Sequence, residues 1–221
     1  MKDLAVVMLT CDKYEAVWDT WYHYFKKYWK LDVPVYFIND KLDCPFDDMT
    51  QIKVDIPEIE LWTKKLRVAV EQIPEQHLFI LLEDLFFNQS IDDIFMDVYA
   101  TFKALEADAL RILMKPTHSA LIPIHRGLPR NMVRRLHQRD KYLIAYSPNI
   151  WDKDYLLEAL QVDENPWHSE VKGTKRMWDK GKKIYEIELT GWYTNSMRLG
   201  KIQPEGQRLI NEAKNGNSTD S

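Results

Sequence analysis

An apolar run that ends at two adjacent acids constrains this chain more than any other feature. Residues 78–82 are all apolar, which is typical of a short strand buried on both faces of a sheet covered by helices. Glu83 and Asp84 follow at the point where that strand should leave the sheet. Open α/β sheets bind ligands at the carboxyl ends of their strands, so this acidic pair is well placed to hold a metal ion. Alternatively, the two acids cap a turn or pair with a nearby Lys or Arg.

Further apolar segments predict strands that alternate with helices. We expect strands at 4–9, 35–38, 52–56, 109–114, 142–146 and 184–189. We expect helices at 15–29, 61–73, 91–106, 153–160 and 171–180, and a loop or short strands at 116–127. Strand, helix and strand at this spacing form βαβ units. The sequence therefore predicts an α/β fold with one domain, 1–214, and a short disordered tail, 215–221.

Composition narrows the classes of function. The formal net charge of −4 argues against a surface that follows nucleic-acid phosphates, so no nucleic-acid partner is expected. Cys11 and Cys44 are too few for a disulfide framework and lack the spacing of zinc ligands, which favours a reducing compartment. The amino-terminal run resembles a first strand more than a signal peptide, and no run approaches the length of a transmembrane segment. We expect a cytoplasmic protein.

Glycine-rich phosphate-binding signatures, both the P-loop and GxGxxG, are missing from the sequence. A bound nucleotide would therefore be held by side chains and a metal. After the first strand, Thr10, Asp12 and Tyr14 are candidates to hydrogen-bond and stack on a base, although a turn capped by Asp12 explains them equally well. Asn39 is a candidate for base or ribose contacts, and an ordinary Asn-Asp turn is the alternative. Lys65 is a candidate for the diphosphate, although a lysine on an amphipathic helix is more often solvated.

A second informative stretch is Asn-Pro-Trp-His-Ser-Glu at 165–170. Pro166 fixes the turn and Trp167 provides a rigid platform, so we expect Glu170 to be oriented more tightly than a surface glutamate. An oriented carboxylate can accept the proton of an attacking hydroxyl. His168 competes for that role because imidazole titrates near neutrality. Helix capping by Glu170 is the structural alternative.

Several short motifs occur in a fixed order and carry a resemblance. They are the segments 10–14, 28–29, 81–87, 147–156, 165–170, 173–175 and 200–201, together with Trp18 and Trp62. In this order they resemble a family of small glycosyltransferases from bacterial surface-polysaccharide loci and large DNA viruses, including the amino-terminal glycosyltransferase domain of a chlorella-virus protein. The similarity extends from about Val6 to Gly206. It implies a GT-A-like fold, a single α/β/α sandwich with a central mixed, mostly parallel sheet.

The resemblance also implies a metal site. Glu83 and Asp84 stand in for the DXD motif of such enzymes, with Asp84 binding Mn²⁺ or Mg²⁺ on the diphosphate of the donor. The sequence departs from a full DXD because Leu85 and Phe86 follow Asp84, so only one of the usual two acids is in register.

By the same resemblance Glu170 matches the acidic base of inverting relatives, and we assign Trp62, Glu83 and Trp167 to the sugar or acceptor site. The function expected is that of a hexosyltransferase-like enzyme that moves a sugar from a nucleotide-diphosphate donor, a UDP-sugar, to a hydroxyl of a glycan acceptor. A sugar nucleotidyltransferase is an alternative, disfavoured because no glycine-rich loop follows Leu9. A non-catalytic glycan-binding or assembly protein with the same fold is the other.

Overall fold

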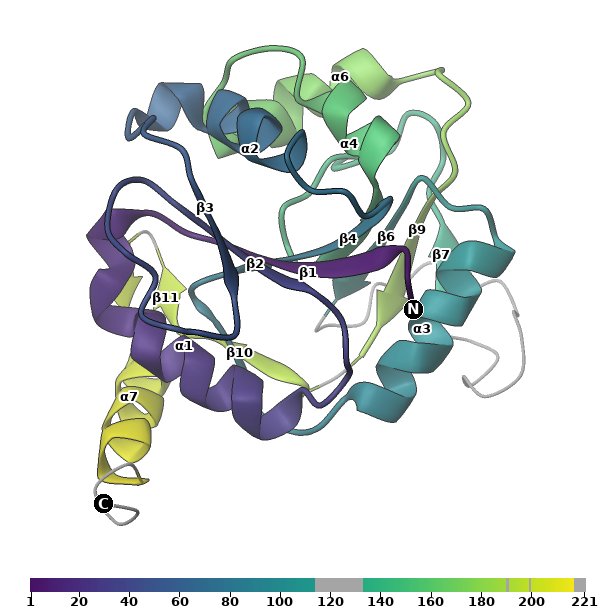
Figure 1. Ribbon diagram of the computed structural model, residues 1–221. Coiled ribbons are helices and arrows are strands. Elements are labelled where there is room, and N and C mark those ends of the chain that lie inside the picture. Colours follow the sequence, from purple (N-terminus) through teal and green to yellow (C-terminus); the bar gives the residue numbers. More distant parts are fainter. Residues whose placement is uncertain (114–132, 190, 199, 217–221) are drawn as a thin grey trace.

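The computed structural model describes residues 1–113, 133–189, 191–198 and 200–216 (Figure 1). Within these ranges one sheet of eight strands has the order β3-β2-β1-β4-β8-β6-β9-β7. Its strands are β1 (Leu4–Leu9), β2 (Val35–Asn39), β3 (Thr50–Lys53), β4 (His77–Leu82), β6 (Ala109–Leu113), β7 (Val133–Arg135), β8 (Asn149–Asp152) and β9 (Ile184–Glu188). Two small ladders pair β5 (Leu85–Phe87) with β10 (Tyr193–Asn195) and β11 (Met197–Arg198) with β12 (Lys201–Ile202).

Strand directions confirm a mixed, mostly parallel sheet. The neighbours β3, β2, β1 and β4 run parallel to one another. β8 lies antiparallel between β4 and β6, β9 is parallel to β6, and β7 is antiparallel to β9. The four consecutive parallel strands deliver their carboxyl ends to one edge of the sheet.

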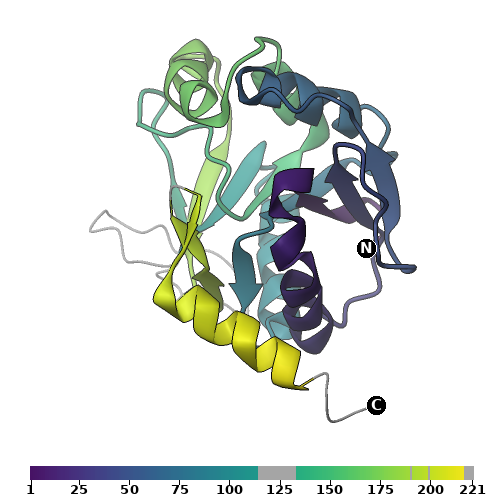
Figure 2. The ribbon, with the colours of Figure 1, turned by 90° about the vertical axis from the view of Figure 1, so that its left-hand side faces the viewer.

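Helices cover both faces of this sheet, so the predicted α/β/α sandwich is confirmed (Figures 1 and 2). One layer contains α2 (Trp62–Val70), α4 (Lys153–Ala159), α5 (Pro166–His168) and α6 (Thr174–Met177). The other contains α1 (Glu15–Tyr28), α3 (Asp92–Ala104) and α7 (Pro204–Gly216). Short 3-10 turns occupy Asp12–Tyr14 and Ile59–Leu61, and a π-helical turn occupies Ser169–Gly173. Within the described ranges, no helix combines the length and apolar character needed to cross a membrane.

The alternation of side chains along β1 divides the interior into two cores. Leu4, Val6 and Met8 belong to the core under α1, α3 and α7. The intervening side chains of Ala5, Val7 and Leu9 belong to the core under α2 and α4. Successive residues of a strand point to opposite faces, so a strand covered on both sides must be apolar throughout. This explains the uninterrupted apolar runs of β1 and β4.

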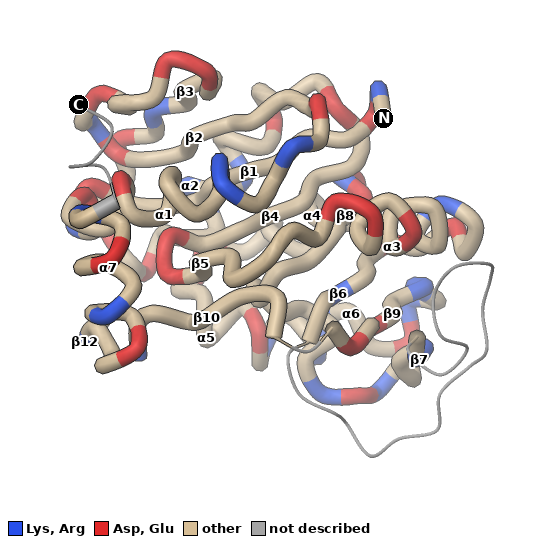
Figure 3. The backbone as a smooth tube through the Cα atoms, turned by 90° about the horizontal axis from the view of Figure 1, so that it is seen from below, with Lys and Arg blue, Asp and Glu red and all other residues tan. Residues whose placement is uncertain are grey.

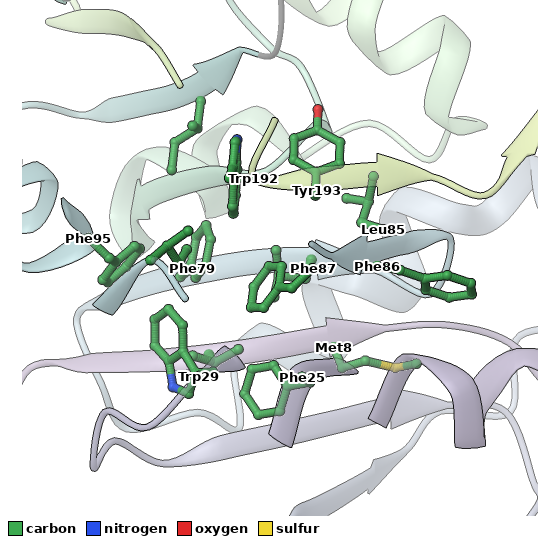
Figure 4. Close-up of a cluster of buried hydrophobic side chains, with 14 of the residues drawn as sticks. Met8, Phe25, Trp29, Phe79, Leu85, Phe86, Phe87, Phe95, Trp192 and Tyr193 are labelled. Atoms are coloured by element: carbon green, nitrogen blue, oxygen red, sulfur yellow. The ribbon is translucent and has the colours of Figure 1, made fainter. Parts of the chain in front are cut away.

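Aromatic residues dominate the first of these cores (Figure 4). Trp29 lies 4.7 Å from Phe95 and 5.7 Å from Phe79 between ring centroids. Phe87 lies 5.5 Å from Trp192, a residue that follows it by more than one hundred positions. Trp18 and Trp21 of α1 are 2% and 1% exposed, so the tryptophan-rich face of this helix is part of the core.

One prediction of local structure is wrong, and two others fall partly or wholly outside the described residues. The segment 142–146 forms turns and not a strand, because its backbone groups bond to Arg111, Thr174 and Glu170 in place of a neighbouring strand. The strand of this region is β8, after Pro148. The predicted tail, 215–221, begins inside α7, which continues to Gly216, and 217–221 lie outside the described residues. The loop expected at 116–127 also lies outside them.

Candidate functional site

Polar side chains gather where the parallel strands end. β1, β2 and β4 pair in parallel, so their carboxyl ends meet at one edge of the sheet. Thr10 follows β1, Asn39 ends β2, and Glu83 with Asp84 follows β4. Figure 3 shows the acidic turn in red where the chain enters β5. The structure therefore brings together the residues that the sequence predicts at this edge.

The side chain of Lys65, on helix α2, contacts the chain at the ends of both β1 and β2. Its ammonium group donates to the carbonyl oxygen of Thr10 at 2.8 Å and to Oδ1 of Asp40 at 2.5 Å. The side chains of Lys65 and Asp40 are only 4% and 8% exposed, so this lysine is buried and not solvated. The Lys65 ammonium is thus bound to the protein itself, and its contact with a diphosphate stays a prediction. We refer to Thr10, Tyr14, Asp40, Lys65, Glu83 and Asp84 as the strand-end site.

Asp12 and Asn39 contact each other and organise the loop after β2. The Asp12 carboxylate accepts hydrogen bonds from the Asn39 side chain at 2.8 Å and from the backbone of Lys41 and Leu42 at 2.9 and 3.0 Å. Burial alone would raise the pKa of Asp12, but these amide donors outweigh it and hold the pKa below its usual value. Both residues therefore have a structural role, and their contact with a base stays a prediction.

The two adjacent carboxyl groups at the end of β4 both have raised pKa values. Glu83 is 9% exposed, and burial, reinforced by the charge of Asp84, raises its pKa to about 8. Burial raises the pKa of Asp84 to about 6. Within the described part of the chain, Oδ1 of Asp84 is buried and has no hydrogen-bond partner. A buried carboxylate oxygen without a partner is costly, so a bound cation would stabilise it.

A late segment of the chain completes this edge. Ser196 donates from its backbone nitrogen and its hydroxyl to the carbonyl oxygen of Asp84, at 2.7 and 3.0 Å. Burial raises the pKa of Tyr193 to about 12, with the Asp84 charge adding to the rise. Burial and the charges of Glu83 and Asp84 also raise the pKa of Tyr14. Tyr14, Tyr193 and Ser196 therefore lie close to the acidic pair.

The residues around Asp84 suit a divalent cation only when a bound ligand supplies most of the donor atoms. Among the described residues, no group of three or more His, Cys, Asp or Glu side chains is arranged to hold a metal. Mg²⁺ in nucleotide sites is commonly bound by one or two carboxylates together with substrate phosphates. The unpartnered oxygen of Asp84 suits that kind of site, in which the ligand supplies most of the donors.

Glu170 lies in a second group of residues. Its Oε1 accepts a hydrogen bond from the backbone nitrogen of Tyr146 at 2.9 Å. Burial raises the pKa of Glu170, while the Tyr146 N–H and the Arg111 charge oppose the rise. The Tyr146 hydroxyl lies 2.8 Å from Oγ of Ser169, and its ring meets the Trp62 ring edge-on at 4.5 Å between centroids. Tyr146 therefore connects Trp62 with Glu170.

Helical turns carry this second group, and they begin earlier than the predicted start at residue 171. Asn165 caps α5 by accepting from the His168 backbone nitrogen at 2.8 Å, and its amide donates to Glu60 at 2.9 Å. The chain continues through the π-helical turn that contains Glu170, a conformation frequent at functional sites. Trp167 is 60% exposed and His168 is also exposed, so both rings are accessible to a ligand.

Helix α2 connects the two groups. Trp62 and Lys65 lie three residues apart on it, which places them on the same face. Trp62 contacts Tyr146, which holds Glu170, and Lys65 contacts the ends of β1 and β2. Among the described residues no hydrogen bond or ion pair joins Asp84 directly to Glu170. The predicted site thus divides into two groups with a shared helical support.

No protein-family model matches the chain, and no curated protein matches it. Solved structures do match. The structure of S. aureus TarS 1-349 in complex with UDP-GlcNAc has a TM-score of 0.58 and 17% identity and covers 96% of this chain. The complex of TarS 1-349 with UDP has a TM-score of 0.55 and 15% identity, and the longer TarS chain has a TM-score of 0.56 and 15% identity.

The chain has a glycosyltransferase-like fold. At identities of 15–17%, the similarity to TarS shows the fold alone. This chain spans 36% of the longer TarS chain and 66% of the 1-349 chain bound to UDP-GlcNAc. The matches support the expected GT-A-like arrangement, but not the narrower resemblance to a chlorella-virus protein.

Sequence reasoning missed four residues that support these groups: Arg111, Tyr146, Tyr193 and Ser196. Ser196 reaches Asp84 across 112 positions, and Tyr146 reaches Glu170 through its backbone. Neither contact leaves a periodic pattern in the sequence. The only available signal is the short 147–156 motif that follows Tyr146 and contributes to the resemblance.

Proposed function

We propose that this protein is a glycosyltransferase that moves a sugar from a UDP-sugar to a hydroxyl of a glycan acceptor. One observation carries the proposal: an unpartnered, buried oxygen of Asp84 lies at the carboxyl edge of the parallel strands in a fold similar to that of a glycosyltransferase. TarS 1-349, which shares the fold, was solved with UDP and with UDP-GlcNAc. We therefore infer that the strand-end site binds a nucleotide-sugar.

The donor would lie with its diphosphate near Asp84. Mn²⁺ or Mg²⁺, held by Asp84 and the phosphate oxygens, would supply positive charge that offsets the charge of the departing UDP. Tyr14, in the 3-10 turn that follows β1, offers a ring for stacking on the base, and Thr10, Asp12 and Asn39 lie at the same edge of the sheet. Lys65 would keep the ends of β1 and β2 in place through its buried contacts.

Glu170 is the proposed base. In an inverting transfer the acceptor oxygen forms a bond to the anomeric carbon while the bond from that carbon to the phosphate oxygen breaks, and UDP leaves with the electron pair. The proton of the acceptor hydroxyl passes to Glu170, whose burial raises its pKa and so favours proton uptake. The exposed rings of Trp167 and His168, with Trp62 and Glu83, would form the walls that hold sugar and acceptor.

Binding of the nucleotide gives the first test. A ligand that binds only the native state raises its stability by mass action, so UDP with Mn²⁺ should raise the melting temperature of the protein. The increase should fall when EDTA removes the metal and should be lost in Asp84→Asn. Equal melting temperatures with and without UDP and Mn²⁺ would overturn the proposal.

Product analysis separates the alternatives. Release of UDP from a UDP-sugar indicates a glycosyltransferase, whereas formation of pyrophosphate from UTP and a sugar 1-phosphate would indicate a nucleotidyltransferase. UDP binding without any turnover would indicate a non-catalytic glycan-binding or assembly protein.

A further inference from the structure

A cleft outside the strand-end site lies between α1, α7 and the ladder of β5 with β10. Its volume is about 470 Å³, within the range of sites for small molecules. Helix α7 lies against α1 in both ribbon views (Figures 1 and 2). Lys27, Tyr28, Asn88, Thr194, Arg208 and Glu212 line it, and we call it the α1–α7 cleft.

Aromatic rings from α1 form one wall of this cleft. The rings of Tyr24 and Tyr28 stack with centroids 6.4 Å apart and planes 10° from parallel. The buried Tyr24 hydroxyl donates to the Leu209 carbonyl oxygen at 3.1 Å, which fixes α7 against α1. Tyr28 is only partly buried, and the Lys27 ammonium lies 5.0 Å from its ring centroid. The wall thus combines a rigid aromatic surface with a polar rim.

The facing wall is polar but electrically balanced. Arg208 bonds to Glu205 at 2.5 and 3.0 Å and also to Glu212. Two cations, Lys27 and Arg208, therefore face two carboxylates in the same cleft. Glu205 and Glu212 already bond to the Arg208 guanidinium, so a phosphate or another anion would have to displace these carboxylates to reach it. The charges favour a neutral ligand.

Side-chain amide and hydroxyl groups close the end of the cleft. Thr194 Oγ1 donates to Asn88 Oδ1 at 3.0 Å, and the Asn88 amide lies 3.3 Å from the Gly191 carbonyl oxygen. Amides, carboxylates and guanidinium groups can bond to the many hydroxyls of a ligand. A partly exposed ring can pack against its apolar face. A purely apolar ligand would cut these polar groups off from water without offering them any further hydrogen bond.

We propose that the α1–α7 cleft binds a neutral saccharide. Asp84 precedes β5 and Asn88 follows it, so the two sites are separated by a three-residue strand, roughly 10 Å in length. The cleft is therefore distinct from the strand-end site, and saccharide binding there does not depend on sugar transfer at Asp84.

Nuclear magnetic resonance titration with neutral tetrasaccharides of glucose, galactose and N-acetylglucosamine tests this proposal. At least one of them should bind with a millimolar dissociation constant and shift backbone signals of α1, α7 and β5. Tyr28→Ala and Asn88→Ala should each weaken that binding about tenfold, because they remove a ring surface and an amide from the cleft. Retained signal dispersion in the variants shows that they fold.

Two controls make the outcome decisive. Asp84→Ala should leave the dissociation constant unchanged, whereas it should abolish UDP binding if the proposed function is correct. Ile94→Ala, at an exposed position of α3, is the matched surface control and should have no effect. The saccharide proposal is wrong if none of the three tetrasaccharides binds, or if Tyr28→Ala and Asn88→Ala bind as tightly as the wild type.

Discussion

Lys65 and Asp40 form a buried ion pair at the edge of the sheet where β1 and β2 end. Their nitrogen and oxygen atoms are 2.5 Å apart, and the same lysine donates to the Thr10 carbonyl oxygen. The pair fixes helix α2 to the strand ends, and α2 also carries Trp62, which contacts the group around Glu170. The buried lysine therefore fixes the helix that contacts both groups.

Removing that cation should destabilise the fold strongly. Lys65→Met leaves Asp40 as a buried carboxylate without its partner, and we expect a loss of about 3–5 kcal/mol in the free energy of unfolding. Urea denaturation measures this loss. Lys53→Met breaks the exposed pair with Asp43 and is the matched control, with an expected loss below about 1 kcal/mol. Similar losses in both variants would show that the buried pair has no special role.

Glu83 should make the stability of the free protein depend on pH. Its folded pKa of about 8 lies above its unfolded value, so the folded state holds the proton more tightly. The resulting stability is present below about pH 4.5 and is lost as the pH rises through about 8. Glu83→Gln removes this dependence. Relative to wild type, the variant should gain about 2 kcal/mol or more between pH 5 and pH 9, measured by chemical denaturation.

The control for this titration is Glu71→Gln, which changes an exposed glutamate. Its stability should follow that of the wild type across the same range. An identical pH dependence in wild type and Glu83→Gln would mean that Glu83 is not held protonated in the folded protein.

Gly206 should not tolerate a side chain. A Cβ at this position would lie 2.4 Å from the Ser196 carbonyl oxygen, so Gly206→Ala must push α7 away from Ser196. We expect a loss of about 1–3 kcal/mol in the free energy of unfolding, as in other overpacked sites. Ser196 holds the Asp84 carbonyl oxygen, so UDP binding should also weaken. Gln207→Ala, at the next and exposed position, is the control, and equal stability of the two variants would contradict this argument.

The sequence predicts those parts of the fold that depend on local pattern. The apolar runs of β1 and β4 predict strands buried on both faces, and the spacing of Trp18 and Trp21 predicts the buried face of α1. The position of Glu83 and Asp84 after a buried strand predicts the edge of the sheet where polar groups gather.

Contacts between distant parts of the chain could not be predicted from sequence pattern. The residues of β10 pair with β5 across more than one hundred positions, and Ser196 reaches Asp84 in the same way. The segment 142–146 has the apolar composition of a strand, yet side chains from three elements bind its backbone. The position of Lys65 on an amphipathic helix favours a solvated side chain. Only the tertiary structure shows that this lysine is buried and paired with Asp40.

The rate of UDP release from UDP-GlcNAc in the presence of Mn²⁺ tests the central claim most directly, because that claim assigns Asp84 and Glu170 to one reaction. Wild type should release UDP, slowly to water and faster once an acceptor glycan is added. Asp84→Asn should lower the rate about 10²–10³-fold, and Glu170→Gln about 10²–10⁴-fold while UDP still binds. UDP release by both variants at the wild-type rate would contradict the account.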